Sequence, residues 1–168
     1  DNGTSAGCKF PGLDTEPTLG FNAGMRGRKS SIYEGGHRVP FFVRWPAGIQ
    51  QPGRSWNQLV GQVDLLATFA ELIEAELPAN AGEDSQSFLS VLTHPTSNPV
   101  RLPLINHSSN GRFAITERHW KLILPLGKMK MELYDLTTDP GETNNIAAQH
   151  PEVVDQLTKK ASDIVLNG

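Results

Sequence analysis

The apolar side chains follow a helical pattern in two stretches of the chain. Between residues 64 and 76 they recur at the three- and four-residue spacing of one helix face, with Asp64 in the first turn and Pro78 beyond the end. This stripe consists of Leu65, Leu66, Phe69, Leu72 and Ile73. A second stripe begins at Pro151, which suits a first helical turn. The pattern predicts amphipathic helices over 64–76 and 151–166, and a shorter helix over 87–92.

Strand-like runs gather in the last third of the chain. They cover residues 102–106, 112–116, 120–125 and 130–135. Short turn pairs separate them, and one pair, Asn110-Gly111, is a strong hairpin signal. An earlier run, residues 39–46, is β-branched and aromatic with a proline near each end, which predicts a short buried strand.

These elements predict an α/β chain in two parts, with α+β character in the chain taken alone. Residues 1–100 carry a strand and a helix, and residues 101–168 form a small antiparallel sheet with a packed C-terminal helix. Residues 1–36 are rich in Gly, Ser, Thr and Asn and show almost no apolar period. Long irregular segments of this kind are usually functional or disordered.

Composition narrows the function classes. The 168 residues include 15 Lys and Arg against 18 Asp and Glu, a net charge of −3, which gives no electrostatic case for nucleic acid. No apolar run approaches the ~20 residues that a membrane span needs. The single cysteine, Cys8, excludes an internal disulfide and a cysteine-based zinc site.

Four segments occur in an order that is typical of one family. They are Asp1-Asn2-Gly3; Arg26-Gly27-Arg28-Lys29 with Tyr33 to Pro40; Trp120 to Ile123; and Glu132 to Leu136 with Asp139, Pro140 and Glu142. This succession resembles the type I, formylglycine-dependent sulfatases of the alkaline phosphatase superfamily. The resemblance spans essentially the whole chain, and its most specific part is the Arg-Gly-x-Lys and Glu-Gly-Gly-x-Arg-Val-Pro run. It implies the C-terminal portion of a sulfuric ester hydrolase, similar to the arylsulfatases.

The resemblance assigns Asp1 and Asn2 to a calcium site. A carboxylate beside a carboxamide offers oxygen ligands, which suit a hard divalent cation. Calcium takes ~6–8 oxygens, so the remaining ligands are expected upstream. A plain turn is the alternative for Asp-Asn-Gly.

The resemblance also implies that Lys29 binds the sulfate group, because an ammonium offsets negative charge on an ester oxygen and its leaving group. The alternative for Lys29 is a solvated loop lysine. His107 is a candidate substrate contact at the pocket rim, and a turn histidine without a role is its alternative. Glu34, the glycines after it and Arg38 are interpreted as structural, with Glu34 and Arg38 pairing in the core. The other four histidines show no ligand spacing.

The family nucleophile is a formylglycine made from the first residue of Cys/Ser-x-Pro-x-Arg. Cys8 is rejected for this role, because its proline stands three positions on, no arginine follows in place, and it lies after the metal pair. The nucleophile is therefore expected upstream of Asp1. Taken alone, the chain should be inactive and should expose an apolar face that favours self-association.

Three functions stay open at this point. The intact protein hydrolyses sulfate esters, or it is a phosphate or phosphonate monoester hydrolase of the same superfamily. As a third alternative, the chain is a stand-alone non-catalytic binding or assembly module. The family resemblance favours sulfate ester hydrolysis and a periplasmic or extracellular location.

Overall fold

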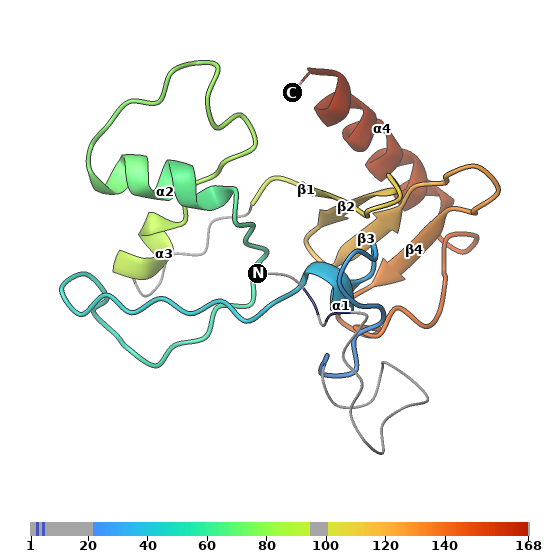
Figure 1. The fold of residues 1–168 in the computed structure, drawn as a ribbon, viewed down its shortest axis with the longest axis horizontal. Coiled ribbons are helices and arrows are strands. Elements are labelled where there is room, and N and C mark those ends of the chain that lie inside the picture. The colour runs from blue at the N-terminus through green and yellow to red at the C-terminus, as the bar shows by residue number, and fades with distance from the viewer. Residues whose placement is uncertain (1–2, 4, 6–21, 95–100, 168) are drawn as a thin grey trace.

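The structure, a computed structural model, describes residues 3, 5, 22–94 and 101–167. Its helices are α1 (Glu34–His37), α2 (Asp64–Leu72), α3 (Leu89–Thr93) and α4 (Pro151–Asn167). Its strands are β1 (Leu104–His107), β2 (Phe113–Glu117), β3 (Trp120–Ile123) and β4 (Glu132–Asp135). The strands form one antiparallel sheet in the order β1-β2-β3-β4, and α2 and α3 pack together beside it (Figure 1).

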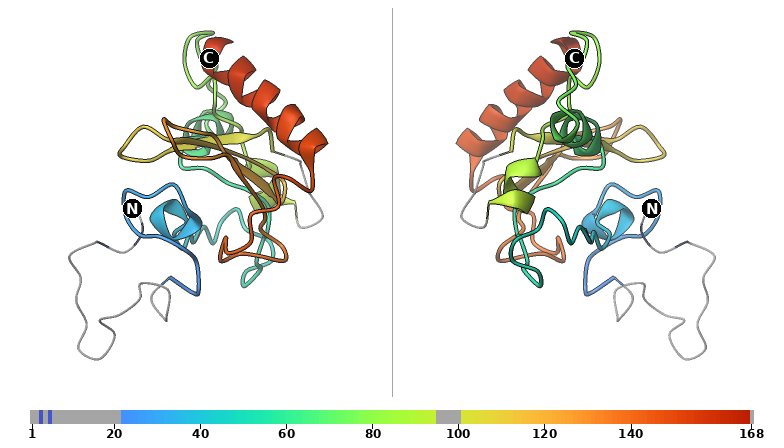
Figure 2. Two further views of the ribbon diagram at one scale, coloured as in Figure 1. Left: turned by 90° about the vertical axis from the view of Figure 1, so that its right-hand side faces the viewer. Right: turned by 90° about the vertical axis from the view of Figure 1, so that its left-hand side faces the viewer.

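One face of the sheet is covered by α4. Side chains alternate across a strand, so Ile115, Leu122 and Leu133 point to the same face, where they meet Leu157 and Ala161 of α4. All five are buried, and together they form the larger apolar core of the described chain. Figure 2 shows α4 running across this face while α1 lies beyond the opposite one.

The opposite face is mixed in character. Ala114, Ile123 and Tyr134 pack against Ile32, which comes from the segment just before α1. Lys121 and Thr116 share this face, and both are buried. Since charged side chains are rarely fully buried without a partner, Lys121 needs compensating groups from the α1 side of the sheet.

The structure confirms the predicted antiparallel sheet with its packed C-terminal helix. Each strand starts and ends within two residues of its predicted bounds. Local turn chemistry explains this accuracy, because Gly111 (φ 81°) and Arg118 (φ 55°) adopt the left-handed conformation that tight hairpins require. The short helix predicted over 87–92 forms as α3, two residues later at its start and one at its end.

The predicted helix over 64–76 forms as α2 but is shorter than predicted. It ends at Leu72, because Glu74 is left-handed (φ 55°) and the Ala75 amide donates back to the Ala70 carbonyl, as in a Schellman ending. Such endings usually carry glycine at the left-handed position, where this sequence has Glu74. The stripe is not core in this chain, since Phe69 and Ile73 are 56% and 71% exposed.

The buried strand predicted over 39–46 is also wrong for this chain. Residues 39–45 form no sheet, and Phe42 is 89% exposed. A strand needs a neighbour to pair its backbone groups. The only sheet in the described ranges lies in the C-terminal half, and it does not include this segment.

A buried ion pair joins α2 to the segment that leads into β1. Arg101 donates from Nε and Nη2 to the two carboxylate oxygens of Asp64, at 2.7 and 2.6 Å. Asp64 also accepts the amides of Gly61 and Gln86. Burial works against ionisation of Asp64, but these bonds outweigh it and hold its pKa below the usual value. None of the helices that the structure describes is long and apolar enough to cross a bilayer.

Candidate functional site

The single-turn helix α1 lies directly on the backbone of residues 26–31. A Cβ on Gly36 would stand 2.4 Å from the Ser31 carbonyl oxygen and 2.9 Å from that of Arg28. A Cβ on Gly35 would meet the Arg26 carbonyl oxygen at 2.6 Å. Only glycine permits backbones to approach so closely, so the two glycines are explained by the contact between α1 and the loop that holds Lys29.

The segments that carry the predicted site residues meet around α1. The Gly3 amide, one residue after Asn2, donates to the Gly36 carbonyl at 3.0 Å. On the other side of the loop, the Ser109 amide donates to the Ser30 carbonyl at 3.1 Å. Lys29 precedes Ser30, and His107 lies two residues before Ser109. This hydrogen bond therefore brings the loop that holds Lys29 next to the end of β1 that holds His107.

The side chains of these predicted residues are described only in part. Asp1 and Asn2 lie outside the described residues. Lys29 is exposed and forms no hydrogen bond or ion pair with another described residue. His107 is exposed at the end of β1, with its ring 5.9 Å from that of Phe113. The roles of all four residues stay predictions.

A buried ammonium stands between α1 and the sheet. Lys121 is fully buried, and its Nζ lies 2.9 Å from Glu34 Oε1, 2.9 Å from Glu142 Oε1 and 3.1 Å from His37 Nε2. The contact to Glu142 is an ion pair with poor hydrogen-bond angles. The second Glu142 oxygen accepts the backbone amide of Glu34 at 2.6 Å. We call Glu34, His37, Lys121 and Glu142 the lysine cluster.

The two carboxyl groups of the lysine cluster are shifted in opposite directions. Burial disfavours ionisation of Glu34, but Lys121 outweighs it and lowers the Glu34 pKa. For Glu142 burial is the stronger effect and raises the pKa, with Lys121 opposing it. The ammonium of Lys121 thus compensates two carboxyl groups. Of the two, the fully buried Glu142 has the greater desolvation penalty.

His37 is held in its neutral form. Burial and the neighbouring Lys121 both disfavour the imidazolium and lower the His37 pKa to about 4. Because Nζ of Lys121 only donates, Nε2 of His37 must accept, which leaves the ring proton on Nδ1.

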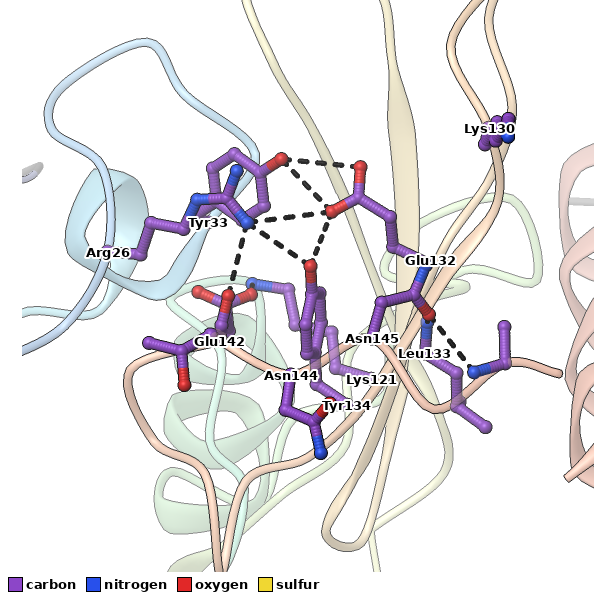
Figure 3. A network of polar contacts seen from close by, with 12 residues as sticks. Arg26, Tyr33, Lys121, Lys130, Glu132, Leu133, Tyr134, Glu142, Asn144 and Asn145 are labelled. Carbon is purple, nitrogen blue, oxygen red and sulfur yellow. Dashed lines mark hydrogen bonds and ion pairs between the residues drawn. The ribbon is translucent and has the colours of Figure 1, made fainter. Parts of the chain in front are cut away.

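A second polar network continues from the lysine cluster toward the loop (Figure 3). Arg26 stacks over the Tyr33 ring at 3.7 Å, and its Nη1 donates to the Tyr134 hydroxyl and to the Glu142 carbonyl. Tyr33 and Tyr134 both donate to Glu132, which also receives Arg112 at 2.7 Å. Burial opposes ionisation of Glu132, but Tyr134 and Arg112 outweigh it and lower its pKa. Burial, together with Glu132, raises the Tyr134 pKa.

Sequence reasoning found the strands and motifs that carry this site, but it missed the lysine cluster. Glu34 and Arg38 do approach to 3.5 Å, yet Arg38 is exposed, and the buried partner of Glu34 is Lys121. A lysine inside the apolar run Trp120 to Ile123 was the available signal. His37 received no role, and a histidine inside the Glu-Gly-Gly-His turn gives little signal by itself.

A further match to the nucleophile pattern lies within the chain. Residues 97–101 spell Ser-x-Pro-x-Arg. Arg101 is occupied by its ion pair with Asp64, 37 residues earlier in the chain, and Ser97 lies outside the described residues. The run also follows the Asp1-Asn2 pair, whereas the family order places the nucleophile before it, so we assign Ser97 no catalytic role.

The described residues hold no ready-made metal cluster. No group of three or more His, Cys, Asp or Glu side chains within these ranges is arranged to bind an ion. Asp1 and Asn2 fit calcium by donor chemistry, one as a carboxylate and one as a carboxamide. They would supply part of a ligand set.

Comparisons with known proteins define the class. Residues 27–166 match the family described as N-sulphoglucosamine sulphohydrolase, C-terminal. An N-acetylgalactosamine-6-O-sulfatase of Bacteroides thetaiotaomicron is 38% identical in an alignment 148 positions long that covers 80% of this chain and 28% of that protein. Arylsulfatase K of Xenopus laevis is 28% identical over 82% of this chain and 27% of its own length. The chain thus spans under a third of these relatives.

Comparison with solved structures supports the same class. A structure connected with the metabolism of multiple glycosaminoglycans by Bacteroides thetaiotaomicron matches with a TM-score of 0.73 and 36% identity, over 83% of this chain and 32% of its own. The crystal structure of Ps i-CgsB matches with a TM-score of 0.71 at 22% identity, over 83% of this chain and 31% of its own, and supports the fold alone. The chain belongs to the N-sulphoglucosamine sulphohydrolase C-terminal family and is a sulfatase C-terminal region.

Proposed function

We propose that the intact protein hydrolyses sulfate esters to an alcohol and inorganic sulfate, and that this chain supplies the sulfate-binding lysine. The observation that carries the proposal is the meeting of three segments at α1. Gly3 binds Gly36, Ser109 binds Ser30, and Gly35 and Gly36 rest on residues 26–31. The backbones of Gly3, the Lys29 loop and the residues after His107 therefore converge, which supports a shared anion site.

In this proposal the residues have distinct tasks. Lys29 contacts a sulfate ester oxygen and offsets the charge that develops as the ester bond breaks. Its exposed side chain has no partner among the described residues, so it is available to a substrate. His107 contacts the remainder of the substrate from the rim. The formylglycine nucleophile belongs to the part of the protein that precedes Asp1.

Calcium is the proposed metal. Asp1 and Asn2 contribute one carboxylate and one carboxamide oxygen, and upstream residues complete the set of ~6–8 ligands. The ion, when bound, adds positive charge beside the sulfate group. Gly3, the next residue, donates to Gly36 of α1, the helix on which residues 26–31 pack, which supports a metal site near the lysine loop.

The substrate class is proposed from the relatives. The relative named N-acetylgalactosamine-6-O-sulfatase covers most of this chain at 38% identity, which favours a sulfated hexosamine over an algal polysaccharide, a choline ester or an aryl sulfate. Such a substrate is extracellular material, so a periplasmic or extracellular location agrees with it. The division of the chain at residue 100 into a core part and a sheet subdomain belongs to the same proposal.

Matched esters test the function. We expect the intact protein with calcium to release sulfate from 4-nitrophenyl sulfate faster than phosphate from 4-nitrophenyl phosphate, and to lose activity when calcium is chelated. Ser97→Ala should retain wild-type activity, because Ser97 lies after the metal pair. Preferred phosphate release would favour the phosphoryl alternative, and loss of activity in Ser97→Ala would move the nucleophile into this chain.

A further inference from the structure

The position of α1 is set from outside the helix. Four residues form one helical turn with no side-chain cap, and such a short helix has no stability of its own. Glu34, Gly35 and Gly36 are nevertheless buried. Tertiary contacts must therefore hold α1, and the strongest polar contacts come from the lysine cluster.

We propose that Lys121 is a positioning residue: its buried ammonium fixes α1 against the C-terminal sheet and thereby places both the Lys29 loop and the segment after Asn2. The proposal rests on the proposed function for its catalytic meaning. The structural part of the proposal does not depend on that function. It states that Lys121 of β3 fixes the position of α1, and with it the positions of the Lys29 loop and of Gly3.

The ammonium of Lys121 is matched to its surroundings. It has two hydrogen-bond partners, Glu34 and His37, and an ion-pair partner, Glu142, all within 3.1 Å. The two hydrogen-bond partners belong to α1, and the ion-pair partner belongs to the segment that follows β4. Glu142 also accepts the Glu34 amide, so the side chain and the first amide of α1 are both fixed.

The constraint passes from α1 to the site through backbone contacts. The Gly35 amide donates to the Arg26 carbonyl at 2.7 Å, and the Gly36 carbonyl accepts from Gly3 at 3.0 Å. Neither glycine has room for a Cβ, so α1 cannot shift without moving residues 26–31 or Gly3. A displacement of about 1 Å at reacting groups costs roughly 100-fold in rate.

The test uses the intact protein with Lys121→Met, which keeps the length of the side chain and removes its charge. Leu157→Ala is the matched control, because Leu157 is equally buried but lies on the α4 face of the same sheet. Amide hydrogen exchange is read at Gly3, Gly35 and Gly36, and kcat and KM are measured on 4-nitrophenyl sulfate.

We expect Lys121→Met to raise exchange at these three amides at least tenfold and to lower kcat/KM by about 10- to 100-fold, with kcat affected as well as KM. Leu157→Ala should leave both within about twofold at a temperature where each variant is folded. Equal exchange and equal kinetics in the two variants would overturn the proposal.

A milder variant covers the case in which Lys121→Met does not fold. His37→Ala removes one acceptor and leaves both carboxyls on Lys121, so we expect a smaller rise in Gly3 exchange, of about two- to tenfold. Unchanged exchange there would overturn the proposal. A wild-type protein without sulfatase activity would instead refute the proposed function, while the exchange measurements would still decide the role of Lys121.

Discussion

At the scale of single residues, the α1 side of the sheet is governed by burial of charge. Lys121 and Glu142 are both fully buried, and removal of Lys121 would leave the Glu142 carboxyl group without its ion-pair partner. Breaking a buried ion pair from one side typically costs about 3–5 kcal/mol. The fold is therefore sensitive to the loss of Lys121, and burial and the neighbouring charges shift the pKa values of Glu34, His37 and Glu142.

His37 gives this cluster a defined pH dependence. The His37 pKa is about 4 in the folded protein, against 6.5 for the free side chain. As the pH falls from 6.5 toward 4, His37 therefore takes up a proton in the unfolded chain but stays neutral in the folded chain. Above pH 6.5 the neutral His37 makes its full contribution to the free energy of unfolding. Between pH 7.5 and pH 5 this contribution falls by about 2 kcal/mol.

The measurement is the midpoint of thermal unfolding of the intact protein at pH 7.5 and pH 5, in wild type and in His37→Gln. Lys121, Glu34 and Arg38 face His37 and are retained in both proteins. The pKa of Glu34 is lowered, so protonation of Glu34 reduces stability as the pH falls, at a lower pH than for His37. The pKa of Glu142 is raised, so its protonation increases stability as the pH falls. The wild-type midpoint should fall more than that of His37→Gln, and parallel curves would contradict this account.

At the scale of elements, the glycines of α1 control how closely the Lys29 loop approaches. In Gly36→Ala the new methyl group would collide with the Ser31 and Arg28 carbonyls, which are backbone atoms and cannot rotate away. Gly111→Ala is the control, since its position has open space and only a positive φ of 81°.

We expect Gly111→Ala to lower stability by about 1 kcal/mol, from the left-handed conformation alone, without changing KM. Gly36→Ala should lower stability more and raise KM for 4-nitrophenyl sulfate by about tenfold or more, because the loop that holds Lys29 must move. Thermal unfolding and steady-state kinetics of the intact protein measure both effects. An identical KM in the two variants would show that the close approach of α1 to the Lys29 loop does not affect substrate binding.

The elements also show what the sequence could predict. The strands follow from local signals, namely alternation within each strand and turn pairs such as Asn110-Gly111 between them. The lysine cluster needs Glu34, Lys121 and Glu142 to meet across 108 residues, and no periodicity encodes such a meeting. The failure at residues 39–46 has the same origin, because a strand depends on a partner that the described chain does not provide.

At the scale of the whole molecule, the N-terminal part of the described chain, here called the apolar flank, exposes large apolar side chains. Phe69 and Ile73, at the end of α2, are exposed, as is Phe42 in the segment predicted to be a strand. The chain spans 28% of the length of the Bacteroides sulfatase, so the rest of the protein is the proposed cover for this flank. The family thereby gives a reason for the exposed stripe of α2 and for the error at residues 39–46.

We expect the isolated 168-residue chain to self-associate through this flank, whereas the intact protein keeps it covered. Sedimentation velocity at several concentrations measures this directly. Phe42→Ser with Phe69→Ser should reduce the association, and the matched control Phe113→Ser, on the sheet beside His107, should not. A strictly monomeric wild-type chain would contradict the expected uncovered surface.

The central claim is that Lys29 binds the sulfate group of a sulfate ester. Its most direct test is the kcat/KM of the intact protein for 4-nitrophenyl sulfate in Lys29→Ala, compared with Lys128→Ala, which alters an exposed lysine in a hairpin turn. We predict a loss of about 100- to 1,000-fold for Lys29→Ala, from the missing charge stabilisation, and no change for Lys128→Ala. Equal activity of the two variants would contradict the account.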